Sequence, residues 1–158
     1  INALAETLHV GSPYTGSKGT LIMTGTVFTV TNSVIVDGPS VANKGRISLT
    51  VDGTPAGLDL GFAATLTVNQ GVINITFAEP VIPNPEQAYP IYWGLRWQGD
   101  HLSALSNLYL TTNLVWTPTS SFTNPRALTP VHIFVDENIT YVGARMLTRP
   151  KGAMFSIK

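Results

Sequence analysis

Apolar and polar side chains alternate along much of the chain after residue 20. A period of two is typical of a half-buried β-strand, because successive side chains leave opposite faces of a pleated backbone. The clearest alternation lies in residues 91–98, where the apolar positions are Ile91, Trp93, Leu95 and Trp97. Because aromatic rings bury large areas, we expect this strand to form the spine of the hydrophobic core.

The opposite face of this expected strand is polar but also aromatic. It carries Tyr92, Arg96 and Gln98, with Asp100 and His101 beyond its end. Such a face suits a saccharide, since sugars stack their C–H faces on rings while their hydroxyls bond to charged groups at the edge. It also suits a subunit interface, because interfaces are enriched in tyrosine, tryptophan and arginine. Both interpretations stay open for Tyr92, Arg96, Asp100 and His101.

Other short segments are rich in apolar and β-branched residues, and several of them alternate in the same way. With residues 91–98 they predict roughly ten strands with turn signals between them. They are residues 21–31, 34–36, 47–51, 58–62, 66–68, 73–77, 114–116, 131–135, 139–143 and 153–157. The segments 66–68 and 73–77 predict a hairpin across Asn69-Gln70-Gly71. Residues 102–110 fit either a helix or a strand.

This pattern predicts an all-β fold, an antiparallel β-sandwich resembling a jelly roll. Proline-rich residues 79–86 and 117–130 are expected to cross between its parts, because proline lacks the N–H that a central strand donates. No internal repeat is evident. We expect residues 1–20 to form a neck or linker and residues 21–158 a single head domain.

The chain carries few charges. Only 11% of its 158 residues are charged and the net charge is zero, which argues against nonspecific nucleic-acid binding. Such a surface is covered by hydroxyl and amide groups or by neighbouring subunits, so we expect a homo-oligomer. The absence of cysteine fits a protein made in a reducing cytosol, including a part of a virion. No apolar run is long enough to predict membrane insertion.

Motifs for catalysis or metal binding are not found. His9, His101 and His132 lack the close spacing of a zinc motif, so neither a metal nor a cofactor is expected. The sequence also lacks a nucleophile elbow and a Walker loop. Asp59, Glu79 or Asp100 could form a glycosidase pair in space, but no pattern selects them. We therefore expect a protein without catalytic activity.

The last third of the chain resembles a known family. The passage runs His132-Ile133-Phe134-Val135-Asp136-Glu137-Asn138-Ile139-Thr140-Tyr141-Val142-Gly143-Ala144, and Arg149 precedes a final segment ending in Lys158. It is similar to the head domains of receptor-binding proteins from siphophages of Gram-positive bacteria, lactococcal ones in particular. The resemblance covers about residues 122–158.

This resemblance implies a trimeric β-head at the tip of a baseplate, which binds cell-wall saccharide between subunits. His132 and Arg149 match positions that bind saccharide in the family. Phe134 stands where the family has an acid, and Val142 stands where it has a binding tryptophan, with Tyr141 next to it. The resemblance therefore indicates His132, Tyr141 and Arg149 as saccharide-binding residues.

The leading hypothesis is a phage receptor-binding head, a homotrimer located at the tail tip or fibre of a virion. It would bind host cell-surface saccharide and contact other virion or baseplate proteins through its N-terminus. The first alternative is a virion structural protein, a jelly-roll capsid or decoration subunit. The second alternative is a glycosidase or depolymerase domain.

Overall fold

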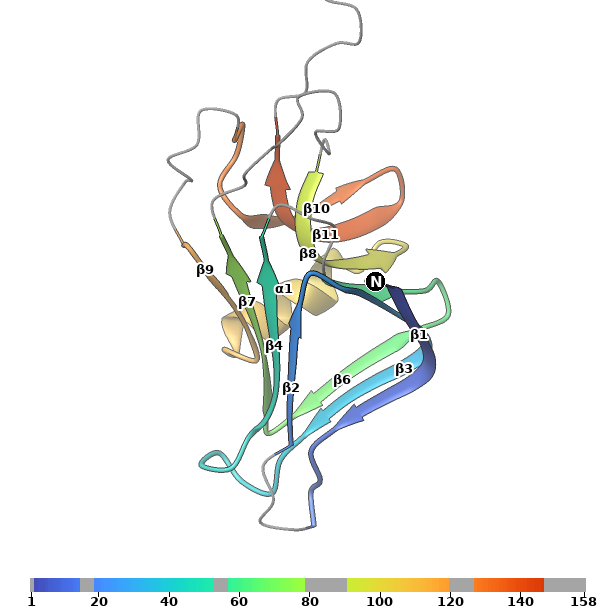
Figure 1. Ribbon diagram of the computed structural model, residues 1–158, viewed down its shortest axis with the longest axis vertical. Coiled ribbons are helices and arrows are strands. Elements are labelled where there is room, and N and C mark those ends of the chain that lie inside the picture. The colour runs from blue at the N-terminus through green and yellow to red at the C-terminus, as the bar shows by residue number, and fades with distance from the viewer. Residues whose placement is uncertain (1, 15–18, 53–56, 79–90, 120–126, 147–158) are drawn as a thin grey trace, which may run out of the picture.

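The computed structural model describes residues 2–14, 19–52, 57–78, 91–119 and 127–146, which are mostly β with one short helix (Figure 1). The elements in chain order are β1 (Asn2–Val10), β2 (Thr20–Thr24), β3 (Val27–Asp37), β4 (Gly45–Val51), β5 (Gly57–Leu60), β6 (Thr65–Asn69), β7 (Gly71–Phe77), β8 (Ile91–Gln98), α1 (Leu102–Leu110), β9 (Leu114–Thr117), β10 (His132–Asp136) and β11 (Ile139–Arg145). The all-β expectation is confirmed. Of the two possibilities for residues 102–110, the helix is the one observed.

The strands form a larger and a smaller sheet. The larger, seven-stranded sheet has the order β1-β3-β5-β8-β11-β10, with β6 paired to the second half of β3. The smaller, four-stranded sheet has the order β2-β4-β7-β9. From β1 to β9 the chain alternates between the two sheets, except that β5 and β6 both pair with β3 of the larger sheet. From β3 to β9, each strand lies parallel to an earlier one. This is the path of a parallel β-solenoid, in which each coil adds strands to both sheets.

The expected antiparallel pairing is therefore wrong for most of the described chain. It is found in β8, β11 and β10, where β11 runs antiparallel to both neighbours. The hairpin expected at Asn69-Gln70-Gly71 is also absent, because Leu66 pairs with Val34 and Ile73 pairs with Ile47. Alternation predicts which side chains are buried, but it contains no information about strand direction or partner. Residues 69–71 instead form a corner at which the chain passes from β6 of the larger sheet to β7 of the smaller sheet, and Gln70 there has a φ of 50°.

The coils repeat every 26 residues at one corner, a period that we did not expect from the sequence. In the register, Val10 lies opposite Val36, Thr20 opposite Arg46, and Gly45 opposite Gly71. The same spacing is visible in the printed sequence as pairs and triplets of identical residues. These are Pro13 and Pro39, Lys18 and Lys44, Gly19, Gly45 and Gly71, and Thr24, Thr50 and Thr76.

The glycines at this corner allow successive coils to approach closely. A Cβ atom added to Gly45 or to Gly11 would overlap the carbonyl oxygen of Asp37, and one added to Gly71 would lie 2.6 Å from the carbonyl oxygen of Val36. Gly11 also has a φ of +90°, a conformation that other residues rarely adopt. Coil stacking at the corner thus depends on the absence of side chains.

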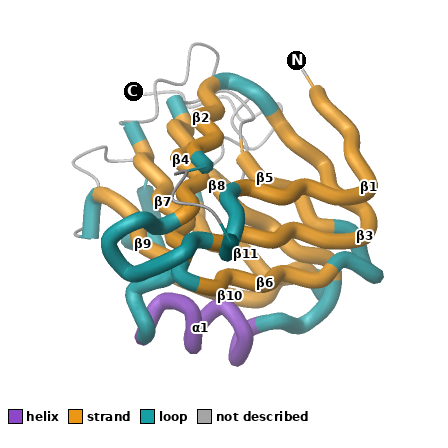
Figure 2. The backbone as a smooth tube through the Cα atoms, turned by 90° about the horizontal axis from the view of Figure 1, so that it is seen from below, coloured by secondary structure: helices purple, strands orange, loops and turns teal. Residues whose placement is uncertain are grey.

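One hydrophobic core lies between the two sheets. The largest fully buried side chains come from both sheets and from α1, and include Val34, Leu58 and Leu95 of the larger sheet, Ile47, Leu49, Ile73, Ile75 and Leu114 of the smaller sheet, and Leu105 of α1. Helix α1 contacts β9 and β10, and Figure 2 shows it running beside β10. Residues 2–10, expected to be part of a neck, form β1 and pair with β3 along their length. The expected final strand at residues 153–157 lies outside the described residues.

Candidate functional site

Strand β8 contains a bulge that changes which of its side chains face outward. Val142 of β11 lies opposite Leu95, but the next residue, Gly143, lies opposite Trp93, so Gly94 is left without a partner. A Cβ atom at Gly94 would overlap the side chain of Ile75, which places this position against the core. The alternation therefore shifts by one residue at Gly94.

Because of this shift, Tyr92 and Trp93 lie on the faces of the sheet opposite to those expected from the sequence. Tyr92 was expected on the polar face, but it is only 7% exposed. Its hydroxyl donates to the carbonyl oxygens of Val51 at 2.6 Å and Ala78 at 3.0 Å. Tyr92 is therefore part of the interior and is not available to a saccharide. Trp93, expected in the core, is only partly buried, and the guanidinium of Arg96 lies 4.6 Å from the centre of its ring.

Arg96 lies in a row of side chains that crosses the outer face of the larger sheet. The register aligns Thr29, Asp59, Arg96, Tyr141 and Phe134, from β3, β5, β8, β11 and β10. Arg96 Nε donates to Asp59 Oδ1 at 2.9 Å and Arg96 Nη2 donates to Asp59 Oδ2 at 3.0 Å. The bond to Asp59 raises the pKa of Arg96 above its ordinary value. These two parallel bonds hold the guanidinium in one orientation.

Beyond Arg96, the row continues into a stack of rings. The ring of Phe134 lies 4.7 Å from His132 and 5.4 Å from Tyr141, and both pairs are stacked. The guanidinium of Arg145 lies 4.7 Å from the centre of the Phe134 ring. Phe134 is thereby covered, while His132, Tyr141 and Arg145 are only partly buried. We call the surface formed by Trp93, Arg96, His132, Phe134, Tyr141 and Arg145 the outer aromatic face.

The electrostatics of this face keep Tyr141 neutral. Burial raises the pKa of Tyr141 above the ordinary value for tyrosine, and the nearby Arg96 opposes part of that effect. The hydroxyl can therefore both donate and accept a hydrogen bond at neutral pH. Together the face offers flat rings, an oriented guanidinium and a neutral hydroxyl, groups that suit a hydroxyl-rich ligand.

The structure brings together residues that the sequence indicated separately. Arg96 came from the alternation in residues 91–98, whereas His132 and Tyr141 came from the resemblance, and all three lie on the outer aromatic face. Arg149 lies outside the described residues. Val142, at the position of the family's binding tryptophan, is fully buried.

Three residues of the face were missed from the sequence. Strict alternation places Trp93 in the core, whereas the bulge at Gly94 turns its side chain to the outer face. A glycine inside an expected strand was the available signal, since such glycines often mark bulges. Phe134 and Arg145 acquire their roles from contacts across β10 and β11, which no local pattern reveals.

Asp100 and His101 have structural contacts where β8 passes into α1. Asp100 Oδ1 accepts from the backbone N–H of Leu102 at 3.2 Å, and the His101 ring stacks on Trp97 at 3.7 Å. The backbone N–H of His101 donates to the buried Thr140 hydroxyl, which in turn donates to the carbonyl oxygen of Gly99. Trp97 is buried in the core, so these contacts involve the inner side of the strand. Asp100 and His101 are therefore not grouped with Arg96.

The acidic residues considered for glycoside hydrolysis are not paired with one another in the described part of the chain. Asp59 is bound by Arg96, Asp100 bonds to the start of α1, and Glu79 lies outside the described residues. Where the structure describes the chain, it gathers no group of three or more His, Cys, Asp or Glu residues that could hold a metal ion. No helix in that part is long and apolar enough to cross a membrane.

No protein-family model, curated protein or solved structure matches the chain. The outer aromatic face is thus the main ground for assigning a function.

Proposed function

We propose that the chain is a non-catalytic saccharide-binding head, of the kind that phages use to attach to a host cell surface. The observation that carries the proposal is the outer aromatic face, where rings and an oriented guanidinium from β8, β10 and β11 lie side by side. The resemblance of the last third of the chain points to the same residues, His132 and Tyr141.

The face has the chemistry that a sugar requires. The rings of Trp93, His132 and Tyr141 are partly exposed and can stack against the C–H faces of a pyranose. Arg96 is held by Asp59, so it can bond to a ligand hydroxyl without losing much further side-chain freedom. A site that is ordered before the ligand arrives loses less entropy on binding.

Weak binding at each site would be strengthened by several copies. We propose a homotrimer with a sandwich-like head, located at the tail tip or fibre of a virion and attached to other virion proteins through its N-terminal part. The low charge of the chain supports association, as do exposed apolar side chains such as Leu4 and Ile22. Linked sites raise the effective ligand concentration, so modest affinity at one face is sufficient for attachment.

Binding to a glycan array and to host cell-wall polysaccharide tests this function. Tyr141→Ala and His132→Ala should each weaken binding roughly two- to tenfold, because a stacked ring contributes about 0.5–1.5 kcal/mol beyond its buried area. Tyr14→Ala is the matched control, since Tyr14 is 92% exposed and is not part of the face. Absence of saccharide binding, or equal losses in all three variants, would contradict the proposal.

A virion shell or decoration protein is the alternative. The observation that supports it is the exposure of several large apolar side chains. Leu4 is 76%, Ile22 is 72% and Phe62 is 77% exposed in the isolated chain. Particle mass separates the two functions, because a head forms a small closed oligomer while a shell subunit forms large assemblies. Large assemblies without saccharide binding would favour the shell.

A further inference from the structure

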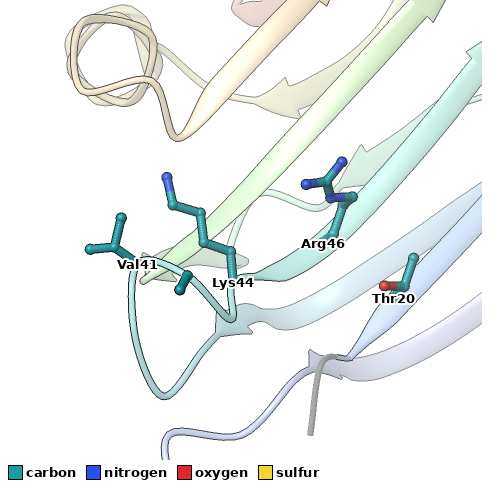
Figure 3. A pocket seen from close by; sticks show the side chains of 5 residues that line it. Thr20, Val41, Lys44 and Arg46 are labelled. Carbon is teal, nitrogen blue, oxygen red and sulfur yellow. The ribbon is translucent and has the colours of Figure 1, made fainter. Parts of the chain in front are cut away.

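A second surface with defined chemistry lies at the corner where the chain passes from the larger to the smaller sheet. A hollow of about 370 Å³ is lined there by Thr20, Val41, Ala42, Lys44 and Arg46 (Figure 3). Figure 1 shows this corner, between β3 and β4, at the opposite end of the molecule from β10 and β11. The hollow is therefore separate from the outer aromatic face.

The backbone holds two cationic side chains on the same side. Lys44 and Arg46 flank Gly45, and side chains two residues apart in extended backbone point the same way. Figure 3 shows both side chains projecting to one side of the strand. Gly45 packs against the carbonyl group of Asp37, so the segment that carries the two cations has little room to shift. Thr20 lies opposite Arg46 in the register and adds a hydroxyl group.

The two cations at this corner form no ion pair with the described part of the chain. No carboxylate is among the described residues that line the hollow, and neither Lys44 nor Arg46 forms an ion pair within those residues. The nearby Asp37 is mostly buried, and its Oδ2 lies 2.9 Å from His9 Nε2. Two cations therefore face an open hollow in a chain whose net charge is zero.

A second hollow adjoins the first and shares Val41 and Lys44 with it. It also measures about 370 Å³ and is lined in addition by Val68 and by the polar residues Asn69, Gln70, Thr111 and Asn113. We call the two hollows together the corner groove. Along the groove, two cations are followed by amide and hydroxyl groups, an order that matches a ligand with an anionic group next to hydroxyls.

We propose that the corner groove binds a carboxylate or phosphate group on a hydroxylated ligand. Lys44 and Arg46 bind the anion, and Thr20 with the amides beyond Lys44 bonds to the neighbouring hydroxyls. This site does not depend on the outer aromatic face, whose rings are suited to the uncharged faces of sugars.

Amide NMR titrations with inorganic phosphate, glucuronate and glucose test the site. Phosphate, glucuronate or both should shift the signals of Thr20, Lys44 and Arg46 to saturation, while glucose should leave them unchanged. The double variant Lys44→Met/Arg46→Gln should raise the dissociation constant at least about tenfold, because it removes two charge-assisted bonds. Lys44→Arg should keep it within about threefold, since the charge remains.

Equal shifts with glucose, no saturable shift with either anion, or unchanged anion binding in the double variant would overturn the proposal. The signals of His132 and Tyr141 report on the outer aromatic face in the same spectra. Failure of the corner groove is thus distinguishable from failure of the proposed saccharide site.

Discussion

Arg96 connects the two halves of the outer face of the larger sheet. On one side it is bound by Asp59 of β5, and on the other it lies opposite Tyr141 of β11. The side chain of Asp59 is only 13% exposed, and that of Arg96 is 33% exposed. A carboxylate in such a position needs a partner, because partial burial removes much of its hydration.

The Asp59–Arg96 pair predicts that removing Asp59 lowers the free energy of unfolding more than removing Asp136 does. Asp59→Ala should lower the free energy of unfolding by about 1–3 kcal/mol, since it leaves Arg96 without its charged partner in a partly buried place. Asp136→Ala should cost less than about 1 kcal/mol, because its 3.5 Å pair with Arg145 is exposed to solvent. Urea unfolding of both variants measures the difference, and equal losses would contradict the role given to Asp59.

The sequence predicted residues of the outer aromatic face better than it predicted the shape of that face. Arg96, His132 and Tyr141 were named, but nothing local could show that β8 and β11 pair and bring them together. Tyr92 and Trp93 were each expected on the wrong face of β8, because strict alternation does not allow for the bulge at Gly94. A bulge changes the phase of a strand by one residue, and whether a glycine forms one depends on the partner strand.

At the scale of elements, most strands were predicted, but the partners of most of them were not. The buried positions Ile47, Leu49 and Val51 follow the alternation as expected. Parallel pairing depends on a corner that the hairpin prediction missed, although the spacing of Gly19, Gly45 and Gly71 was present in the sequence. A repeat of this kind is detectable only when residues 26 apart are compared, because within one coil each glycine looks like an ordinary turn residue.

Coil stacking at this corner predicts unequal tolerance of two glycines. Gly45→Ala should destabilise the fold by about 1–3 kcal/mol, because the new methyl group would overlap the backbone of Asp37. Gly61→Ala should be tolerated, since its Cβ atom would lie 3.5 Å or more from its neighbours. Thermal and urea unfolding of the two variants check this. A stable Gly45→Ala variant would show that the coils are not so closely packed.

For the whole molecule, the described residues leave two strand edges unpaired at one end of the solenoid. Among the described strands, β1 is the edge strand of the larger sheet at this end and β2 is the edge strand of the smaller sheet. Natural proteins usually protect such edges with charges, but Glu6 is the single charged residue in these two strands. Leu4 and Ile22, one on each edge strand, are largely exposed. This end is therefore the expected site of contact between copies.

Light scattering tests this contact together with the proposed trimer. The wild-type chain should have a mass of about three times 16.9 kDa. The double variant Leu4→Lys/Ile22→Lys should shift the mass toward the monomer, because added charges on edge strands oppose association. Phe62→Lys, at an equally exposed apolar position between β5 and β6, should leave the mass unchanged. A monomeric wild type would contradict the oligomer, whereas an unchanged double variant would place the contact away from β1 and β2.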